Sequence, residues 1–142
     1  MNDSCSLQRF VEAQQPVYPQ ALAELQAGRK RSHWMWFVFP QIQGLGHSEM
    51  AHRYAISDAE QARAYLAHPL LGPRLQDCTR ALLQHAGRSA REILGTPDDL
   101  KFRSSMTLFA AAADEPALFE QALETFFEGK PDRQTLERLD RA

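Results

Sequence analysis

The chain lacks the features that would place it across a membrane, in a secretion pathway or around a metal ion. Its longest strongly apolar run is about six residues, whereas a membrane-spanning helix needs roughly 20. The N-terminal MNDSCSLQRF has neither a basic start nor an apolar core, so it predicts no secretion signal. Cys5 and Cys78 form no CxxC motif and no Cys/His pattern with zinc spacing. We therefore expect a cytoplasmic protein with reduced thiols and without a metal or cofactor.

A strong charge and the common hydrolase motifs are also missing. The net charge is only −2, and the one basic cluster, Arg29–Arg31, is short, so a nucleic-acid binder is disfavoured. No GxSxG elbow and no catalytic Cys/His/Asn signature occurs. His47, Glu49 and His52 form H-x-E-x-x-H, but histidines at this spacing would lie about 140° apart on a helix, unlike those of the zinc-binding HExxH motif. The residues therefore favour neither a metal site nor a hydrolase triad.

The periodicity of the apolar residues predicts an all-α fold. They recur every three or four positions, and no sustained apolar/polar alternation or Asn-Gly or Asp-Gly hairpin signal occurs. Phe37–Phe39 is the one stretch that could be extended, within an irregular aromatic segment that runs from Trp34 and stops at Pro40. We expect a single compact domain over residues 1–142, with about seven to nine helices and with residues 1–5 disordered.

Several helix ends are marked by residues that favour them. A long helix is expected from Leu71 to about Gly87, and Thr96–Asp99 reads as the start of another, with proline and acidic residues in the first turn. Capping residues are expected at Gly28, Ser48, Ser57 or Asp58, Ser89 and Asp132.

The aromatic segment supplies the first of four candidate binding clusters. Trp34, Trp36 and Phe39 would form a flat apolar wall, with the polar groups of His33 and Gln41 nearby. Such a combination suits a planar or sugar-like ligand. The alternative is a core plug, because aromatic side chains in a small protein are most often buried.

The second cluster is Gly44, Gly46 and Ser48, just before an expected helix. Glycines in this position can expose backbone N–H groups to an anion. The spacing matches neither GxGxxG nor GxxxxGK[ST], and a simple turn explains these glycines about as well.

The other two clusters centre on positively charged side chains. Lys101, Ser104 and Ser105 could present an ammonium group and two hydroxyls from one helix, as a base–nucleophile pair or as a cradle for an anion. The alternative has Ser105 bonded back to the carbonyl four residues earlier, with Lys101 solvated. Arg74 lies in a first helical turn, against the dipole preference, so a carboxylate partner or a ligand anion is expected, with a structural salt bridge as the simpler case.

At these residues the chain resembles a known family. The matching segments are RFVEAQ (9–14), GRKRSHWMWFVFPQIQGLGHS (28–48), YLAHPLLGPRL (65–75), KFRSSMTLF (101–109) and the closing FFEGKPDRQTL. They are similar to the bacterial domain-of-unknown-function family 1810, in which leucine is more usual at the position of Phe102. The resemblance implies a single all-helical domain and a cytoplasmic setting, and no established activity. The name calpastatin, sometimes attached to the family, does not carry over, because nothing here resembles that long disordered inhibitor.

These clusters lead to one main hypothesis and two rivals. The main hypothesis is a cleft that binds a small anionic or nucleotide-like ligand. Catalytic turnover is left open, and for it His33 is the candidate general acid/base because histidine titrates near neutral pH. The main hypothesis predicts that all four clusters converge on that cleft. The first rival is a protein-interaction module, which would show a contiguous exposed apolar patch. The weaker rival is a nucleic-acid-associated factor that uses Arg29–Arg31 beside Trp34.

Overall fold

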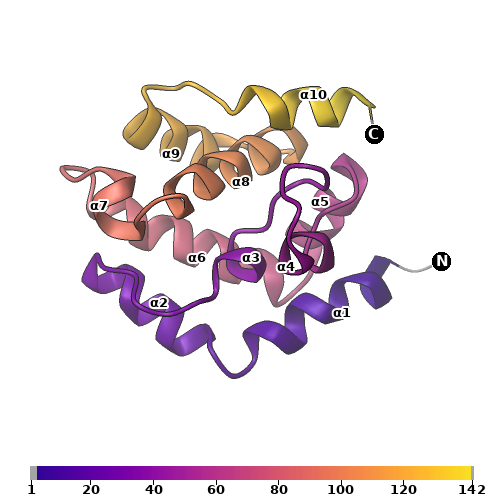
Figure 1. Ribbon diagram of the computed structural model, residues 1–142, viewed down its shortest axis with the longest axis horizontal. Helices are drawn as coiled ribbons and strands as arrows, with labels where there is room; N and C mark the ends of the chain where they lie inside the picture. Colours follow the sequence, from indigo (N-terminus) through magenta and orange to yellow (C-terminus); the bar gives the residue numbers. More distant parts are fainter. Residues whose placement is uncertain (1–2, 142) are drawn as a thin grey trace.

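Helices make up most of residues 3–141, the part of the chain that the computed structural model describes (Figure 1). No strand occurs in this part, so the all-α prediction is confirmed. No helix within it has both the length and the apolarity to cross a bilayer. The helices are α1 (Asp3–Gln14), α2 (Tyr18–Ala27), α3 (Met35–Val38), α4 (Glu49–Arg53), α5 (Ala59–Ala67), α6 (Leu71–Leu83), α7 (Ala90–Leu94), α8 (Asp98–Ala112), α9 (Ala117–Phe127) and α10 (Arg133–Arg141).

The helix ends follow local capping chemistry. Gly28 ends α2 in the left-handed conformation, and the Ser89 hydroxyl and the Glu92 carboxylate form a reciprocal capping box at α7. The side chains of Ser48, Asp58 and Asp132 accept the backbone N–H groups of Ala51, Gln61 and Thr135, respectively. The predicted caps are therefore confirmed, with Asp58 rather than Ser57 at the start of α5.

Two predicted boundaries need correction. Of residues 1–5, which we expected to be disordered, Met1 and Asn2 lie outside the described residues, and residues 3–5 form the first turn of α1. The helix expected to reach about Gly87 ends at Leu83. There the backbone tightens, because the N–H of His85 bonds to Leu82 O at 2.9 Å, three residues back. The His85 ring nitrogen Nε2 lies 3.0 Å from the carbonyl oxygens of Leu25 and Gln26, which ties the end of α6 to the end of α2.

The helices pack around a core rich in aromatic rings. In Figure 1, α1 and α2 lie along one side of the molecule and α9 and α10 along the opposite side, with α6 and α8 between them. The Tyr65 ring on α5 lies 5.3 Å from the Phe10 ring on α1 and 5.4 Å from the Phe109 ring on α8, measured between centroids. Phe102 on α8 lies 4.9 Å from Phe39, which follows α3. Edge and tilted contacts of this kind stabilise a core beyond simple burial.

The aromatic segment is helical rather than extended. Residues Met35–Val38 form the single turn α3, and the side chains of residues 34–39 are all buried except that of Trp36, which is half-buried. The buried amide of Gln14 fixes this turn by donating to the Phe37 carbonyl at 2.6 Å. The segment therefore serves mainly as a core plug, with one ring left at the surface.

Arg74 helps to hold this core plug in place through Gln14. Its guanidinium donates to Gln14 Oε1 at 3.3 Å and lies over the Tyr18 ring, with 4.4 Å between Cζ and the ring centroid. The expected carboxylate partner is not found among the described residues: the partners are an amide oxygen and an aromatic face, which offset the unfavourable position of Arg74 near a helix start.

Candidate functional site

An open groove of about 1020 Å³ lies where four segments meet. Its walls are the surface of α3, the loop between Pro40 and α4, the first turns of α8 and the loop that leads into α10. Six of the residues predicted to bind a ligand line it: Trp36, Gln41, Gly46, Ser48, Lys101 and Ser104. The structure thus brings together members of three predicted clusters that are up to about 70 residues apart in sequence.

The loop before α4 is held by backbone hydrogen bonds. An isolated bridge joins Ile42 to Ile56, with Gln43 N donating to Ile56 O at 2.9 Å and Ile56 N donating to Gln41 O at 2.8 Å. The loop then turns at Gly44 and ends at the Ser48 cap of α4. This wall is therefore fixed at both ends even though it is not a helix.

The opposite wall is tethered by Arg103 and Thr107 of α8. Arg103 donates from Nε to the Lys130 carbonyl at 2.9 Å and from Nη2 to the Pro131 carbonyl at 3.1 Å. The Thr107 hydroxyl accepts the backbone N–H of Asp132 at 2.8 Å. Arg103 thus adds positive charge to the groove, although part of its guanidinium is committed to the backbone.

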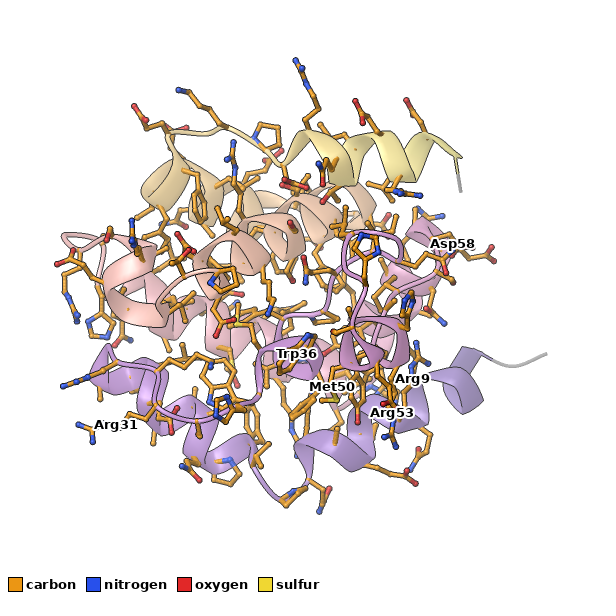
Figure 2. The ribbon with its side chains drawn as sticks, viewed as in Figure 1. Arg9, Arg31, Trp36, Met50, Arg53 and Asp58 are labelled. Carbon is orange, nitrogen blue, oxygen red and sulfur yellow. The ribbon has the colours of Figure 1, made fainter. Side chains whose placement is uncertain are left out.

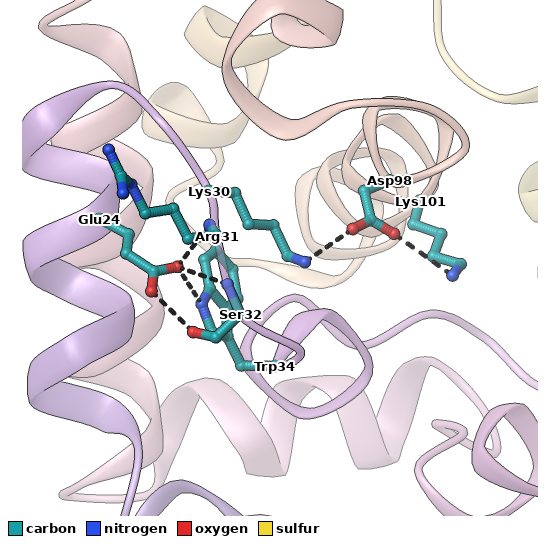
Figure 3. Close-up of polar contacts among 7 residues, drawn as sticks. All are labelled: Glu24, Lys30, Arg31, Ser32, Trp34, Asp98 and Lys101. Carbon is teal, nitrogen blue, oxygen red and sulfur yellow. Dashed lines mark hydrogen bonds and ion pairs between the residues drawn. The ribbon is translucent and has the colours of Figure 1, made fainter.

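The ammonium group of Lys101 is the best-positioned charge in the groove. Asp98 lies between two lysines, with Lys30 Nζ 2.9 Å from Oδ2 and Lys101 Nζ 3.4 Å from Oδ1 (Figure 3). Lys101 Nζ also lies 4.4 Å from the centroid of the Trp36 ring, a cation–π distance. One carboxylate shared by two ammonium groups leaves a net positive charge, which Asp98 and Trp36 hold at the groove wall.

Trp36 is the member of the aromatic wall that faces the groove. Its side chain lies on the face of the molecule seen in Figure 2, whereas Arg31 points away from it at the periphery. The basic cluster therefore does not form one cationic surface with the aromatic side chains. Lys30, the middle residue of that cluster, is only 8% exposed because it pairs with Asp98.

Four other predicted ligand contacts do not reach the groove. Trp34 and Phe39 are fully buried, so the predicted stacking wall is wrong for both of them. His33 is exposed but lines no part of the groove, and Arg74 contacts Gln14 and Tyr18 instead. The predicted convergence of all four clusters is therefore wrong, and His33 is not placed as a general acid/base. The imidazole that does line the groove is that of His47, which we had considered only as a metal ligand.

Both serines of α8 are buried, and they differ in whether they line the groove. Ser104 lines the groove and donates to the Leu100 carbonyl at 3.1 Å, so it makes the back-bond that we expected of its neighbour. Ser105 is fully buried, and its hydroxyl has no hydrogen-bond partner within the described chain. Ser105 therefore belongs to the core, and a Lys101–Ser105 catalytic pair is not formed.

Gly44 lines a second, smaller hollow of about 370 Å³ rather than the groove itself. The two hollows share Leu45, His47 and Gln134, so they are adjacent. The second hollow is completed by Glu137 and Arg138 of α10. These α10 residues were missed because their periodicity indicates only an amphipathic terminal helix.

A buried carboxylate, Glu24 on α2, holds the segment that leads into the aromatic turn. Its Oε1 accepts the Trp34 indole N–H at 2.9 Å and the backbone N–H of Arg31 at 2.9 Å (Figure 3). Ser32 donates to it twice, from its backbone N–H at 3.1 Å and from its hydroxyl at 2.7 Å. Burial alone would raise the pKa of Glu24, but these hydrogen bonds outweigh burial and lower the pKa to about 2. Glu24 therefore stays ionised and, through these hydrogen bonds, fixes the backbone at the start of the aromatic segment.

The comparisons with known proteins agree with this fold over nearly the whole chain. A family model described as "Protein of unknown function (DUF1810)" matches residues 4–139. Among solved structures, the crystal structure of the conserved hypothetical protein Rv1873 from Mycobacterium tuberculosis is similar, with 57% sequence identity and a TM-score of 0.93. That match covers 94% of this chain and 96% of the other. Among curated proteins there is no match.

Proposed function

The chain belongs to the DUF1810 family of proteins of unknown function, and from the geometry of its groove we propose that it binds a small anionic, nucleotide-like ligand beside Trp36. The observation that carries this proposal is the Lys101 ammonium, held between the Asp98 carboxylate and the Trp36 ring at the wall of an open groove. A cation that is already in place loses little conformational freedom when it meets an anion.

The remaining groove residues suit a ligand with both a charged and a planar part. Arg103 and Arg133 add positive charge, and Asp132 is occupied as the cap of α10, where it accepts from Thr135. Trp36 offers a half-buried aromatic surface, and Gln41 offers a side-chain amide. The volume, about 1020 Å³, is at the upper end of the range for small-molecule sites, which favours a nucleotide-sized ligand over a simple ion.

The two rival functions have less support. Among the described residues, Leu100 and Leu136 are the exposed large apolar side chains, and they line different hollows, so no broad apolar docking patch is formed. A nucleic-acid surface is disfavoured because Lys30 is paired with Asp98 and Arg31 points away from the groove (Figure 2).

We expect Lys101→Met to weaken AMP binding by about 10- to 100-fold, since hydrogen bonds to charged groups contribute about 1.5–3 kcal/mol. Methionine keeps an apolar chain against Trp36 and removes the ammonium group with its charge and its hydrogen-bond donors. Isothermal titration calorimetry on the purified protein measures the change. Lys130→Met is the matched control, because it removes the same charge from a side chain that is 69% exposed and does not line the groove. Equal AMP affinity in Lys101→Met and the wild type, or no AMP binding to the wild type, would show that the proposal is wrong.

A further inference from the structure

We propose that Arg138 forms a second anion subsite, so that the ligand carries two adjacent anionic groups, as a nucleoside diphosphate does. This inference rests on the proposed function, because it extends the same groove and names the class of molecule that fills it. It starts from the hollow beside the groove, lined by residues of the Gly44 turn and of α10.

Each of the two adjacent hollows is lined by at least one positively charged side chain. Lys101 lines the larger hollow beside Trp36, and Arg138 lines the smaller one. Leu45, His47 and Gln134 line both, so the two hollows are adjacent and a ligand that lies across these three residues would reach both. A ligand with a single anionic group would use only one of these cations.

The Arg138 guanidinium lies against the backbone of Gly44. A Cβ atom at Gly44 would lie 2.8 Å from Arg138 Cζ and 2.9 Å from Nη1, which is closer than real Cβ atoms approach. Gly44 also has a φ of +94°, a conformation that side chains disfavour. The guanidinium therefore packs against the bare backbone of Gly44, whose positive φ favours glycine at this turn.

The donors of Arg138 are free for a ligand. Arg138 makes no hydrogen bond or ion pair with any residue in the described range, although Glu137 lines the same hollow. A planar guanidinium held by its face presents its N–H edge outward, and this fork matches two oxygens of a phosphate group. Arg138 thus supplies a second cation beside the groove, which we assign to the outer phosphate of a diphosphate whose inner phosphate meets Lys101.

The test compares ADP with AMP on the full-length protein by isothermal titration calorimetry. We expect the wild type to bind ADP about 10-fold more tightly than AMP, and Arg138→Ala to remove that preference while changing the AMP affinity by less than about twofold. Arg138→Gln, which keeps a polar side chain without the charge, should behave in the same way. Arg91→Ala is the control, because it removes an exposed arginine on α7 and should leave both affinities unchanged.

The outcomes separate the two proposals. If the wild type binds AMP and ADP equally, or if Arg138→Ala weakens both alike, the second subsite is wrong and the binding groove beside Trp36 stands. If the wild type binds neither nucleotide, both proposals are wrong. Thermal unfolding of each variant shows whether a loss of binding reflects a loss of folding, and we expect no large change because Arg138 is exposed.

Discussion

Trp34→Ala is expected to lower the free energy of unfolding by about 3–5 kcal/mol, the cost typical of removing a fully buried aromatic ring. Trp34 has no exposed surface and lies between the Phe39 ring, at 6.3 Å between centroids, and the Lys30 ammonium, at 5.1 Å. Its indole N–H donates to Glu24 Oε1 at 2.9 Å, so the substitution leaves a cavity and also takes a donor from a buried carboxylate.

Trp36→Ala is the matched comparison for this prediction. The Trp36 ring is half-buried at the groove, so we expect its loss to cost about 1 kcal/mol of stability while it impairs AMP binding. Urea denaturation followed by far-UV circular dichroism measures both variants. Trp34→Phe, which keeps most of the apolar area but lacks the N–H group, gives a milder case if the alanine variant does not fold. Equal losses of stability at the two positions would contradict the assignment of Trp34 to the core and Trp36 to the groove.

Glu24→Gln is expected to destabilise the protein by about 3 kcal/mol near neutral pH, because the carboxylate is replaced by an amide whose NH₂ group faces hydrogen-bond donors. The figure follows from the pKa of Glu24, which lies at about 2 in the folded protein against an ordinary value of 4.5. Glu12→Gln, at an exposed position on α1, is the control and should change stability by less than about 0.5 kcal/mol.

The pH dependence of this effect has a definite sign. The folded protein holds the pKa of Glu24 below its unfolded value, so the unfolded chain binds the proton more readily. The stabilisation is therefore fully present above about pH 4.5 and is lost as the pH falls toward 2. We expect the difference in stability between the wild type and Glu24→Gln, measured by urea denaturation, to shrink steadily below about pH 5. A difference that stays constant down to pH 3 would mean that the ionised carboxylate is not the source of the effect.

The helices could be predicted from the sequence because their ends depend on neighbouring residues. The Ser89 hydroxyl and the Glu92 side chain lie within one turn, and Asp132 accepts from a residue three positions later. The end of α6 was predicted too late because its cause is distant in sequence. His85 contacts the end of α2, about 60 residues earlier, and no local pattern contains that contact.

The candidate site could be predicted only in part, for the same reason. The residue types in the Trp36 and Lys101 clusters indicated binding, but which tryptophan faces the groove depends on the packing of α3 against α1 and α6. Glu24 looked like an ordinary residue of an amphipathic helix, because its donors come from residues 31–34, which have no regular spacing from it. Arg138 gave no signal, since its position against Gly44 joins segments about 94 residues apart.

The most direct test of the binding groove follows the two indole N–H signals in a ¹⁵N-correlated NMR spectrum during titration with AMP. The chain has two tryptophans, so Trp36→Phe assigns both signals. The Trp36 signal should shift progressively and saturate as AMP binds, while the signal of Trp34, which is buried and bonded to Glu24, stays in place. If neither signal moves at millimolar AMP, or if only the Trp34 signal moves, the ligand does not bind beside Trp36 and the proposed function is wrong.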